Sequence, residues 1–380
     1  MYGNIDRIQE AVSPILMRLL EGTKEKKNYI FGTGWMGTKF WDVCTKMNFQ
    51  FDGFIVTRKT SSTYHGIPVY SLDECTYIMK HATVFVTLRD QEPALLQKLA
   101  ELFSVVVPIT YPRDLTLVEA KFFIDYLKKL GVSCCQDWIM MNGYRFPNPF
   151  LKPDDYLLSW AYEAGDLLLP ALYDDEVRVD EGPYELGMVA LSDGDVVIDA
   201  GANIGLFTCY ALQKNCRVYA FEPLKLAIEY LQEIQSEFKQ RLTICPSALA
   251  EKNSTAVFHV QNYDLLGASL HYNHNSVDVE YEVRLQTIDH AVKEYGIQRV
   301  DFIKADIEGS ERDMLKGAET TIKRWLPKIA ICTYHLQDDK EVLESIIKGY
   351  SSDYVVTHKW KKLFAYVPEE KRNLGGKIGD

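Results

Sequence analysis

The clearest hydrophobic pattern lies in the C-terminal half of the chain, where short apolar runs alternate with amphipathic segments. The apolar runs predict buried strands, and apolar residues recurring every three or four positions predict helices. Strands are predicted at 196–200, 217–221, 242–245, 300–304 and 328–333. Helices are predicted at 204–214, 224–238, 311–324 and 339–348, with a closing antiparallel pair at 354–358 and 363–367. This alternation predicts an α/β fold with a doubly wound sheet and an antiparallel edge.

A smaller α/β unit is predicted in the N-terminal part of the chain. An amphipathic helix is expected over the first 26 residues. Strands follow at 29–31, 51–56, 65–70, 82–87 and 104–108, with helices at 37–47 and 93–103. We expect a Rossmann-like N-terminal domain at 1–112, a connector at 113–180 and a second α/β domain at 181–380. Within the connector, a helix is predicted at 115–130 and irregular structure around 142–149.

Composition narrows the class of protein. The 380 residues are 47% hydrophobic and 25% charged, which excludes disordered, collagen-like and coiled-coil chains. The net charge of −11 argues against a general nucleic-acid-binding protein, because phosphate contacts need a basic face. No apolar stretch suits a membrane span, and the start of the chain lacks the order of a signal peptide. The eight cysteines form no CxxC pair, which favours reduced, buried thiols in a cytoplasmic protein.

The strongest local motif is Val196-Val-Ile-Asp-Ala-Gly-Ala-Asn-Ile-Gly205. Its glycines, Gly201 and Gly205, let the backbone approach a ligand at the start of a helix. Asp199 lies inside the turn, so a zwitterionic or cationic ligand such as S-adenosylmethionine is favoured over a diphosphate. Glu222, in the tripeptide Phe-Glu-Pro, ends the next strand, where an acid can accept both ribose hydroxyls. A loop cap and a helix-start acid would explain either residue alone, but the pair at these strand ends indicates a nucleoside site.

A second group of polar residues follows the fourth and fifth strands of this half. Lys304, Asp306 and Glu308 lie at the carboxyl end of one strand, where ligands bind in open α/β sheets. His335 ends the next strand, and an imidazole is a natural proton acceptor for a hydroxyl nucleophile. A structural role for His335 is the alternative. Asp306, Glu308 and His335 could also hold a divalent metal, although we assign no resident metal here.

Motifs spread over residues 178–340 resemble the FkbM-type S-adenosylmethionine-dependent methyltransferases. The motifs are Asp180-Glu-Gly-Pro-Tyr-Glu185, the loop from Asp199 to Gly205, Phe221-Glu-Pro223, Lys304-Ala-Asp-Ile-Glu-Gly309 with Glu311, Leu315-Lys-Gly-Ala318 and Thr333-Tyr-His335. The resemblance implies a class I methyltransferase fold in the C-terminal half. It also implies O-methylation of hydroxyls on sugars or polyketide-like products.

The resemblance further implies roles for single residues. The cofactor would be lined by Asp199, Gly201, Asn203, Gly205 and Glu222, with Ala248 near the adenine. Asp306 and His335 would face the transferred methyl group as the catalytic pair, and Lys304 and Glu308 would contact the substrate. Many family members have a glutamate where this chain has Thr333-Tyr-His335, which marks a departure from the family at that strand end.

The N-terminal unit has its own glycine-rich turn, Gly32-Thr-Gly-Trp-Met-Gly37, between a predicted strand and a helix. The acid expected after the next strand is missing, since Asp52 lies at the wrong end of that strand, and Arg58 could instead take a phosphate. This unit resembles the small Rossmann-like domain found beside sugar-nucleotide acyltransferases, which can hold a nucleotide sugar. A degenerate scaffold or dimer surface and a redox-cofactor site are the alternatives.

Together these features predict a cytoplasmic methyltransferase that uses S-adenosyl-L-methionine to O-methylate a sugar or sugar-containing metabolite. The expected partner is a small molecule related to a sugar or nucleotide sugar, with no nucleic acid and no membrane span. The sequence also allows a homo-oligomer. The rival functions are a nucleotide-sugar or NAD(P)-dependent oxidoreductase or epimerase that uses the N-terminal turn, and a non-catalytic cofactor-binding module.

Overall fold

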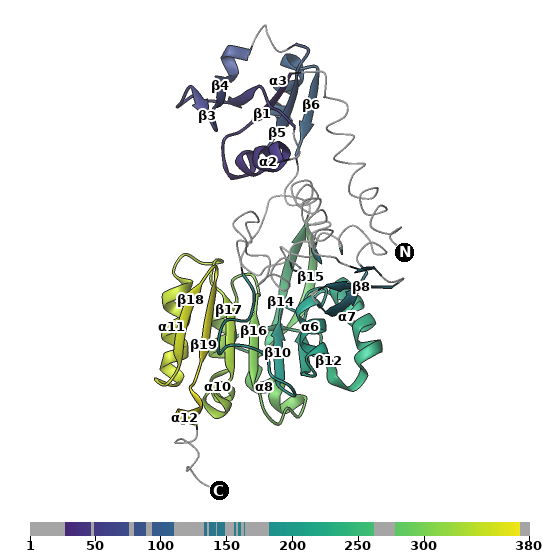
Figure 1. Ribbon diagram of the computed structural model, residues 1–380, viewed down its shortest axis with the longest axis vertical. Coiled ribbons are helices and arrows are strands. Elements are labelled where there is room, and N and C mark those ends of the chain that lie inside the picture. The colour runs from purple at the N-terminus through teal and green to yellow at the C-terminus, as the bar shows by residue number, and fades with distance from the viewer. Residues whose placement is uncertain are drawn as a thin grey trace. The chain divides into compact units, whose positions relative to one another are not determined.

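The computed structural model describes much of the chain (Figure 1). The described residues are 27–46, 49–75, 80–88, 93–109, 133–134, 137–141, 143–148, 156, 159–160, 163, 182–261 and 278–372. The chain forms two compact units, residues 1–134 and residues 135–380. The helices predicted over the first 26 residues and over 115–130 lie outside the described residues. The domain boundaries expected from the sequence remain a prediction.

Unit 1 contains an open sheet of order β3-β4-β2-β1-β5-β6. Its strands are β1 (Asn28–Phe31), β2 (Gly53–Val56), β3 (Thr63–Tyr64), β4 (Ile67–Ser71), β5 (Thr83–Val86) and β6 (Val105–Pro108). Its helices are α2 (Trp35–Lys46), η1 (Leu72–Cys75) and α3 (Pro93–Leu102). All described pairings are parallel except the short β3–β4 pair. The sheet is therefore of the α/β kind that the alternating pattern predicts.

Unit 2 is built on a seven-stranded sheet of order β12-β11-β10-β16-β17-β19-β18. Its strands are β10 (Val196–Ala200), β11 (Arg217–Phe221), β12 (Leu242–Cys245), β16 (Phe302–Ala305), β17 (Lys328–Cys332), β18 (Val355–Lys359) and β19 (Lys362–Tyr366). The first five strands in the sheet are parallel, and β19 is antiparallel to both of its neighbours. This confirms the predicted doubly wound sheet with an antiparallel edge.

The connections of unit 2 are mostly helices. They are α6 (Leu206–Gln213), α7 (Lys225–Phe238), η3 (Lys239–Arg241), α8 (Ile288–Glu294), α9 (Glu311–Lys316), α10 (Glu319–Trp325), α11 (Asp339–Tyr350) and α12 (Glu369–Arg372). The single helix predicted at 311–324 is wrong, because α9 and α10 are separate. Gly317 lies at the break, where an added Cβ would come within 2.2 Å of the carbonyl oxygen of Ala250. This close backbone approach leaves no room for a side chain at that position.

A further small sheet was not foreseen between residues 246 and 299. It contains β13 (Ala248–Leu249), β14 (Ser254–Gln261) and β15 (Asp278–Gln286), with β14 and β15 antiparallel. The sequence of β15 alternates polar residues with Val279, Tyr281, Val283 and Leu285, which is typical of a half-buried strand.

The prediction of irregular structure around 142–149 is also wrong in part. The described elements there are β7 (Ser133–Cys134), β8 (Trp138–Met141) and β9 (Tyr144–Pro147), of which β8 and β9 pair in antiparallel fashion. The two strands are joined across Asn-Gly at 142–143, a common hairpin sequence, and Gly143 has a φ of 81°. In unit 2, β9 is fixed to α6 because Gln213 bonds both the backbone N–H and the carbonyl of Arg145.

The core of unit 2 lies on the faces of its sheet. Val197, Ile198, Phe302 and Ile303 of the two central strands are fully buried, as Val/Ile-rich parallel strands covered on both faces should be. The six cysteines whose side chains are described are all buried free thiols, as predicted. No helix within the described ranges is long and apolar enough to cross a membrane.

Candidate active site

The central pocket of unit 2 opens at the carboxyl ends of β10, β11 and β16. The strand order reverses beside β10, and this switch point is where open α/β sheets bind ligands. The pocket has an empty volume of about 880 Å³. It is lined by Glu163, Tyr184, Gly201, Asn203, Phe207, Phe221, Glu222, Pro223, Leu224, Ala248, Leu249, Phe258, Lys304, Asp306, Ile307, Glu308 and Ser310.

The loop between β10 and α6 lines the pocket with Gly201 and Asn203. Gly201 has a φ of 72°, and a Cβ there would lie 1.9 Å from the carbonyl oxygen of Asp306. Asn203 also has a positive φ, of 47°, and lines the pocket. Gly205 has a φ of 86° and precedes α6, where a Cβ would lie 2.6 Å from Ile234. Gly205 therefore allows α6 to pack against α7 and is not among the pocket-lining residues.

Asp199 is buried beneath this loop. Its side chain is fully buried, forms an ion pair with Lys304 at 3.1 Å and accepts a hydrogen bond from the Thr208 hydroxyl at 2.6 Å. Lys304 donates in turn to the carbonyl oxygens of Ala200 and Gly201. Burial alone would lower the pKa of Lys304, but the carboxylates led by Asp199 outweigh it and raise that pKa. The pair thus ties the glycine-rich loop to β16, and Asp199 is not among the residues that line the pocket.

Glu222 is the acid that does reach the pocket from the end of β11. Its two carboxylate oxygens accept hydrogen bonds from the backbone N–H groups of Leu224 and Asn203, each at 2.9 Å. The side chain is nevertheless buried, and this desolvation raises the pKa of Glu222 to about 7 despite those bonds. Each oxygen keeps further acceptor capacity toward the pocket.

Two pocket acceptors have no hydrogen-bond partner within the described part of the chain. One is Oδ1 of Asn203, and the other is Oε1 of Glu163. Burial raises the pKa of Glu163 well above its usual value. Buried acceptors are normally satisfied, so these two atoms mark where a ligand's donors would bind. Ala248 of β13 lies in the same lining.

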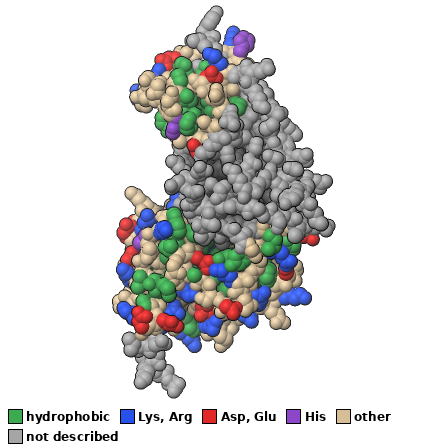
Figure 2. Space-filling model, in the orientation of Figure 1, with side chains coloured by type: hydrophobic (Ala, Val, Ile, Leu, Met, Phe, Trp, Pro, Cys, Tyr) green, Lys and Arg blue, Asp and Glu red, His purple; other side chains and the backbone are tan. Residues whose placement is uncertain are grey.

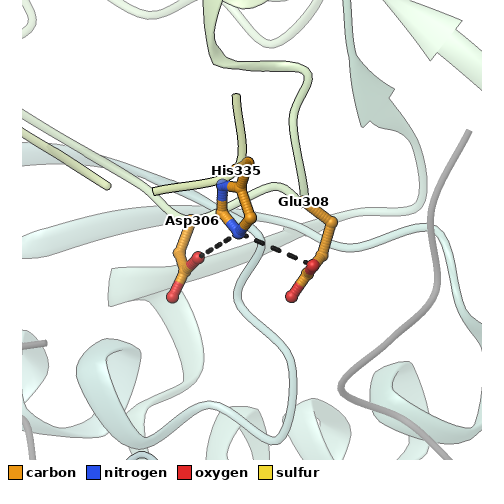
Figure 3. Close-up of side chains that lie close together, drawn as sticks. All are labelled: Asp306, Glu308 and His335. Carbon is orange, nitrogen blue, oxygen red and sulfur yellow. Dashed lines mark ion pairs between the residues drawn. The ribbon is translucent and has the colours of Figure 1, made fainter. Parts of the chain in front are cut away.

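Acidic side chains and one imidazole gather where β16 and β17 end (Figure 3). Nε2 of His335 lies 3.7 Å from Oδ1 of Asp306 and 3.5 Å from Oε2 of Glu308. The other ring nitrogen, Nδ1, lies 3.0 Å from Oε1 of Glu311. Desolvation alone would lower the pKa of His335, but the carboxylates, led by Glu311, raise it to about 9. The imidazole is therefore protonated near neutral pH.

Asp306 lies at the centre of this group. Its Oδ2 accepts a hydrogen bond from the Tyr184 hydroxyl at 2.7 Å. Burial would raise the pKa of Asp306, but His335, Lys304, Lys362 and the Tyr184 hydroxyl together hold it below the usual value. Asp306 thus lines the pocket as a charged carboxylate.

Glu311 fixes the turn that carries Glu308. Its carboxylate is buried and accepts hydrogen bonds from the backbone N–H groups of Ile307 and Gly309. Glu308 has a φ of 52°, an unusual conformation for a residue with a side chain. The turn holds Glu308 in this strained backbone conformation beside His335.

The structure brings most of the residues predicted from the sequence to one place. Those that line the pocket are Gly201, Asn203, Glu222, Ala248, Lys304, Asp306 and Glu308. His335 contacts two of them, whereas Asp199 and Gly205 support the loop from behind. Glu163 and Thr208 were missed. Glu163 belongs to no motif, and Thr208 lies one helical turn into α6, where only its contact with Asp199 reveals a role.

The surface of unit 2 carries mixed charge. Figure 2 shows basic and acidic side chains interspersed with apolar ones over the described part of the face in view.

Comparisons with known proteins show that part of unit 2 is similar to methyltransferases. The model of the methyltransferase FkbM domain matches residues 199–361. The methyltransferase sdnD of Sordaria araneosa is 24% identical over 195 residues, which are 43% of this chain and 75% of that protein. The hexuronic acid methyltransferase AglP of Haloferax volcanii is 24% identical over 195 residues, 50% of this chain and 77% of that protein.

A solved structure of a methyltransferase FkbM from Methylobacillus flagellatus KT is similar at 18% sequence identity, with a TM-score of 0.41 and 90% of each chain covered. The family match begins at Asp199, near the end of β10, and contains β11, β16 and β17, so it includes the strand ends that carry the pocket and the His335 cluster. Residues 199–361 are therefore a methyltransferase FkbM domain.

Proposed function

We propose that the protein is an S-adenosylmethionine-dependent O-methyltransferase whose acceptor is a hydroxyl of a sugar or sugar-containing metabolite. The observation that carries the proposal is the pocket at the strand ends of unit 2, which Glu222, Asn203 and Asp306 line together. The same pocket therefore contains hydrogen-bond acceptors for a nucleoside, on Glu222 and Asn203, and a carboxylate, on Asp306, that can bind the hydroxyl to be methylated.

The residues present fit this cofactor. Glu222 ends the strand next to β10, where an acid accepts ribose hydroxyls in nucleoside-binding α/β folds. Asn203 Oδ1 and Glu163 Oε1 are buried acceptors that an ammonium or hydroxyl donor would satisfy. A cation beside Glu163 would offset the desolvation of its carboxylate. Since Asp199 is neutralised by Lys304, Glu163 is the better candidate for the cofactor's ammonium group.

When bound, S-adenosylmethionine would supply the methyl group of its sulfonium. An acceptor oxygen would bond to the methyl carbon in line as the carbon–sulfur bond breaks, which would leave S-adenosylhomocysteine, and the hydroxyl proton would pass toward Asp306. Asp306 is the group that would accept the hydrogen bond of the acceptor hydroxyl, because it lines the pocket and stays charged. His335 would keep Asp306 ionised and positioned, because at neutral pH it carries a proton already. Alignment of the reacting atoms would supply most of the rate.

A sugar acceptor is supported by the chemistry of the relatives. AglP is a hexuronic acid methyltransferase. All heteroatoms of a hexuronic acid are oxygen atoms, so methylation at a heteroatom of such an acid is O-methylation. Glu308 lines the pocket, is about a third exposed, and carries carboxylate oxygens that can accept hydrogen bonds from sugar hydroxyls.

The test is methyl transfer by the full chain from S-adenosylmethionine to a panel of hexuronic acids, neutral hexoses and a macrolide alcohol. We expect a methyl ether of a sugar, detected by mass spectrometry. Asp306→Asn should lower the rate at least about 100-fold, in the range of lost general-base catalysis. The control Asp353→Asn, which changes an exposed carboxylate paired with Lys371, should leave the rate unchanged. Turnover only with the non-sugar alcohol, or an Asp306→Asn rate equal to that of the wild type, would contradict the proposal.

A further inference from the structure

The cluster formed by Asp306, Glu308 and His335 has the make-up of a metal centre. It offers one imidazole nitrogen and two carboxylate oxygens, and these three atoms all lie within 4.8 Å of one another. Figure 3 shows the two carboxylates flanking the same ring nitrogen of His335. The sequence assigned no resident metal here, but the arrangement of donors favours one.

The distances between the donor atoms would allow one ion to lie among them. The ring nitrogen lies 3.7 Å and 3.5 Å from the two carboxylate oxygens, longer than a hydrogen bond between nitrogen and oxygen. Donors bonded to one ion at about 2.1 Å in tetrahedral geometry lie about 3.4 Å apart. The observed separations are close to that edge length.

The contacts around His335 are those that hold a metal-binding histidine in place. A metal-binding histidine almost always gives its other ring N–H to a carboxylate or carbonyl. Here Nδ1 of His335 lies 3.0 Å from Glu311, whose carboxylate is itself held by two backbone N–H groups. The Tyr184 hydroxyl likewise donates to the oxygen of Asp306 that does not face the imidazole. Both outer partners orient the donor atoms toward the same point.

The local charge also favours a dication. Three carboxylates, those of Asp306, Glu308 and Glu311, face a single imidazole. The buried ammonium groups of Lys304 and Lys362 offset part of this negative charge, although Lys304 is also paired with Asp199. A divalent ion would therefore be retained by an excess of negative charge in a largely buried place.

We propose that Asp306, Glu308 and His335 bind a divalent transition-metal ion of the Mn²⁺ or Zn²⁺ class, with an open position toward the pocket. On binding, the ion takes the place of the proton that Nε2 of His335 carries in the metal-free protein, and this proton is released to solvent. Mixed imidazole and carboxylate donors suit these ions better than Ca²⁺, which takes oxygen ligands alone. Asp306 and Glu308 line the pocket, so the open position is where the acceptor hydroxyl of the proposed reaction would bind. The metal's role in transfer rests on the proposed function, whereas its binding does not.

The experiment titrates Mn²⁺ alone into the full chain, without S-adenosylmethionine, by calorimetry and by electron paramagnetic resonance. We expect one site, with nitrogen modulation of the Mn²⁺ signal from the imidazole. His335→Ala should abolish that modulation and weaken binding at least tenfold, and Glu311→Gln should weaken it about 10- to 100-fold. The matched control is His358→Ala, which removes an imidazole of β18 that is paired with Glu344 and not with the cluster, and should change nothing.

A wild-type chain that does not bind Mn²⁺, or binds it equally in His335→Ala, would overturn the proposal. Should His335→Ala fail to fold by circular dichroism, Glu308→Gln replaces it, because that side chain is 33% exposed and its change leaves the core intact. Competition with Zn²⁺ then identifies the preferred ion. Metal binding without methyl transfer would support the metal site and contradict the proposed function. Methyl transfer without metal binding would support the proposed function and contradict the metal site.

Discussion

The two units each turn from their central strand into a helix through a glycine-rich loop, and the loops share much of their geometry. Gly32 follows β1 with a φ of 111°, and Gly201 follows β10 with a φ of 72°. A Cβ on Gly37 would collide with the carbonyl of Gly32 at 2.1 Å, just as one on Gly201 would collide with that of Asp306 at 1.9 Å. In each unit, at least one glycine of the loop, Gly37 in unit 1 and Gly201 in unit 2, is therefore required by the close approach of the backbone.

The loops differ in the charges around them. In unit 2, Asp199 is buried under the loop with Lys304, and Glu222 ends the neighbouring strand inside the pocket. In unit 1, Asp52 precedes β2 and accepts a hydrogen bond from the backbone N–H of Asn28, while the second residue beyond the end of β2 is the exposed Arg58. The two loops therefore share their glycines but not the charged groups at the strand ends, and this difference is our reason for proposing the cofactor site in unit 2.

The largest difference in stability between the two loops is expected when the aspartate of each loop is replaced. Asp199→Ala leaves the buried ammonium of Lys304 without its partner, and should lower the free energy of unfolding by about 3–5 kcal/mol. Asp52→Ala removes one partly buried hydrogen bond and should cost about 1 kcal/mol. Urea unfolding of both variants measures the difference. Equal losses of unfolding free energy in the two variants would show that the ion pair of Asp199 and Lys304 stabilises the fold no more than the hydrogen bond of Asp52 does.

The glycines come next. Gly201→Ala combines a positive φ with a backbone collision, and should cost about 2–4 kcal/mol along with cofactor binding. Gly34→Ala, at a position with nothing within 4 Å of an added Cβ, should be nearly neutral. Thermal unfolding and cofactor titration of both variants test this, and a stable, cofactor-binding Gly201→Ala protein would refute the account of the loop.

A smaller difference is expected between two threonines early in the helices that follow these loops. Thr208→Val removes the only described hydrogen bond to Oδ2 of buried Asp199, and should cost about 1–3 kcal/mol. Thr38→Val in α2 removes partly exposed bonds to Gly34 and Tyr64, and should cost under about 1 kcal/mol. Chemical unfolding compares them. A larger loss for Thr38→Val would reverse the ranking of the two loops.

The smallest effect is a pH dependence of cofactor affinity. Glu222 has a raised pKa of about 7, and its ionised form is the better acceptor for ribose hydroxyls. S-adenosylmethionine should therefore bind several-fold more tightly one pH unit above this pKa than one unit below it. The raised pKa of Glu222 also makes the free energy of unfolding fall as pH rises from 4.5 to about 7. In this range the folded protein keeps the proton on Glu222, whereas the unfolded chain has lost it. Glu222→Gln should flatten both profiles, and an unchanged slope would contradict the assignment.

Much of the fold could be predicted from the sequence because buried strands are short apolar runs. Strands β10, β11, β12 and β17 lie close to their predicted bounds, as does helix α7. The break at Gly317 could not be predicted, since it depends on the carbonyl of Ala250 from a distant segment. The β14–β15 hairpin was overlooked although the alternation in β15 was present.

The site was harder to predict than the fold. Motif spacing located Glu222 and Asp306 at the correct sheet edge, because carboxyl ends of parallel strands meet there. It could not tell that Asp199 turns inward to Lys304, because the burial of one side chain depends on packing across β10 and β16. Glu163 has no motif at all, so only the folded chain brings it to the pocket.

The most direct test of the central claim is a calorimetric titration of S-adenosylmethionine into the wild-type chain, Glu222→Ala and Arg58→Ala. We predict one site in the wild type, unchanged in Arg58→Ala and weakened at least tenfold in Glu222→Ala, since a lost hydrogen bond to a charged group costs about 1.5–3 kcal/mol. Wild-type affinity in Glu222→Ala, or loss of binding in Arg58→Ala, would contradict the placement of the cofactor in unit 2.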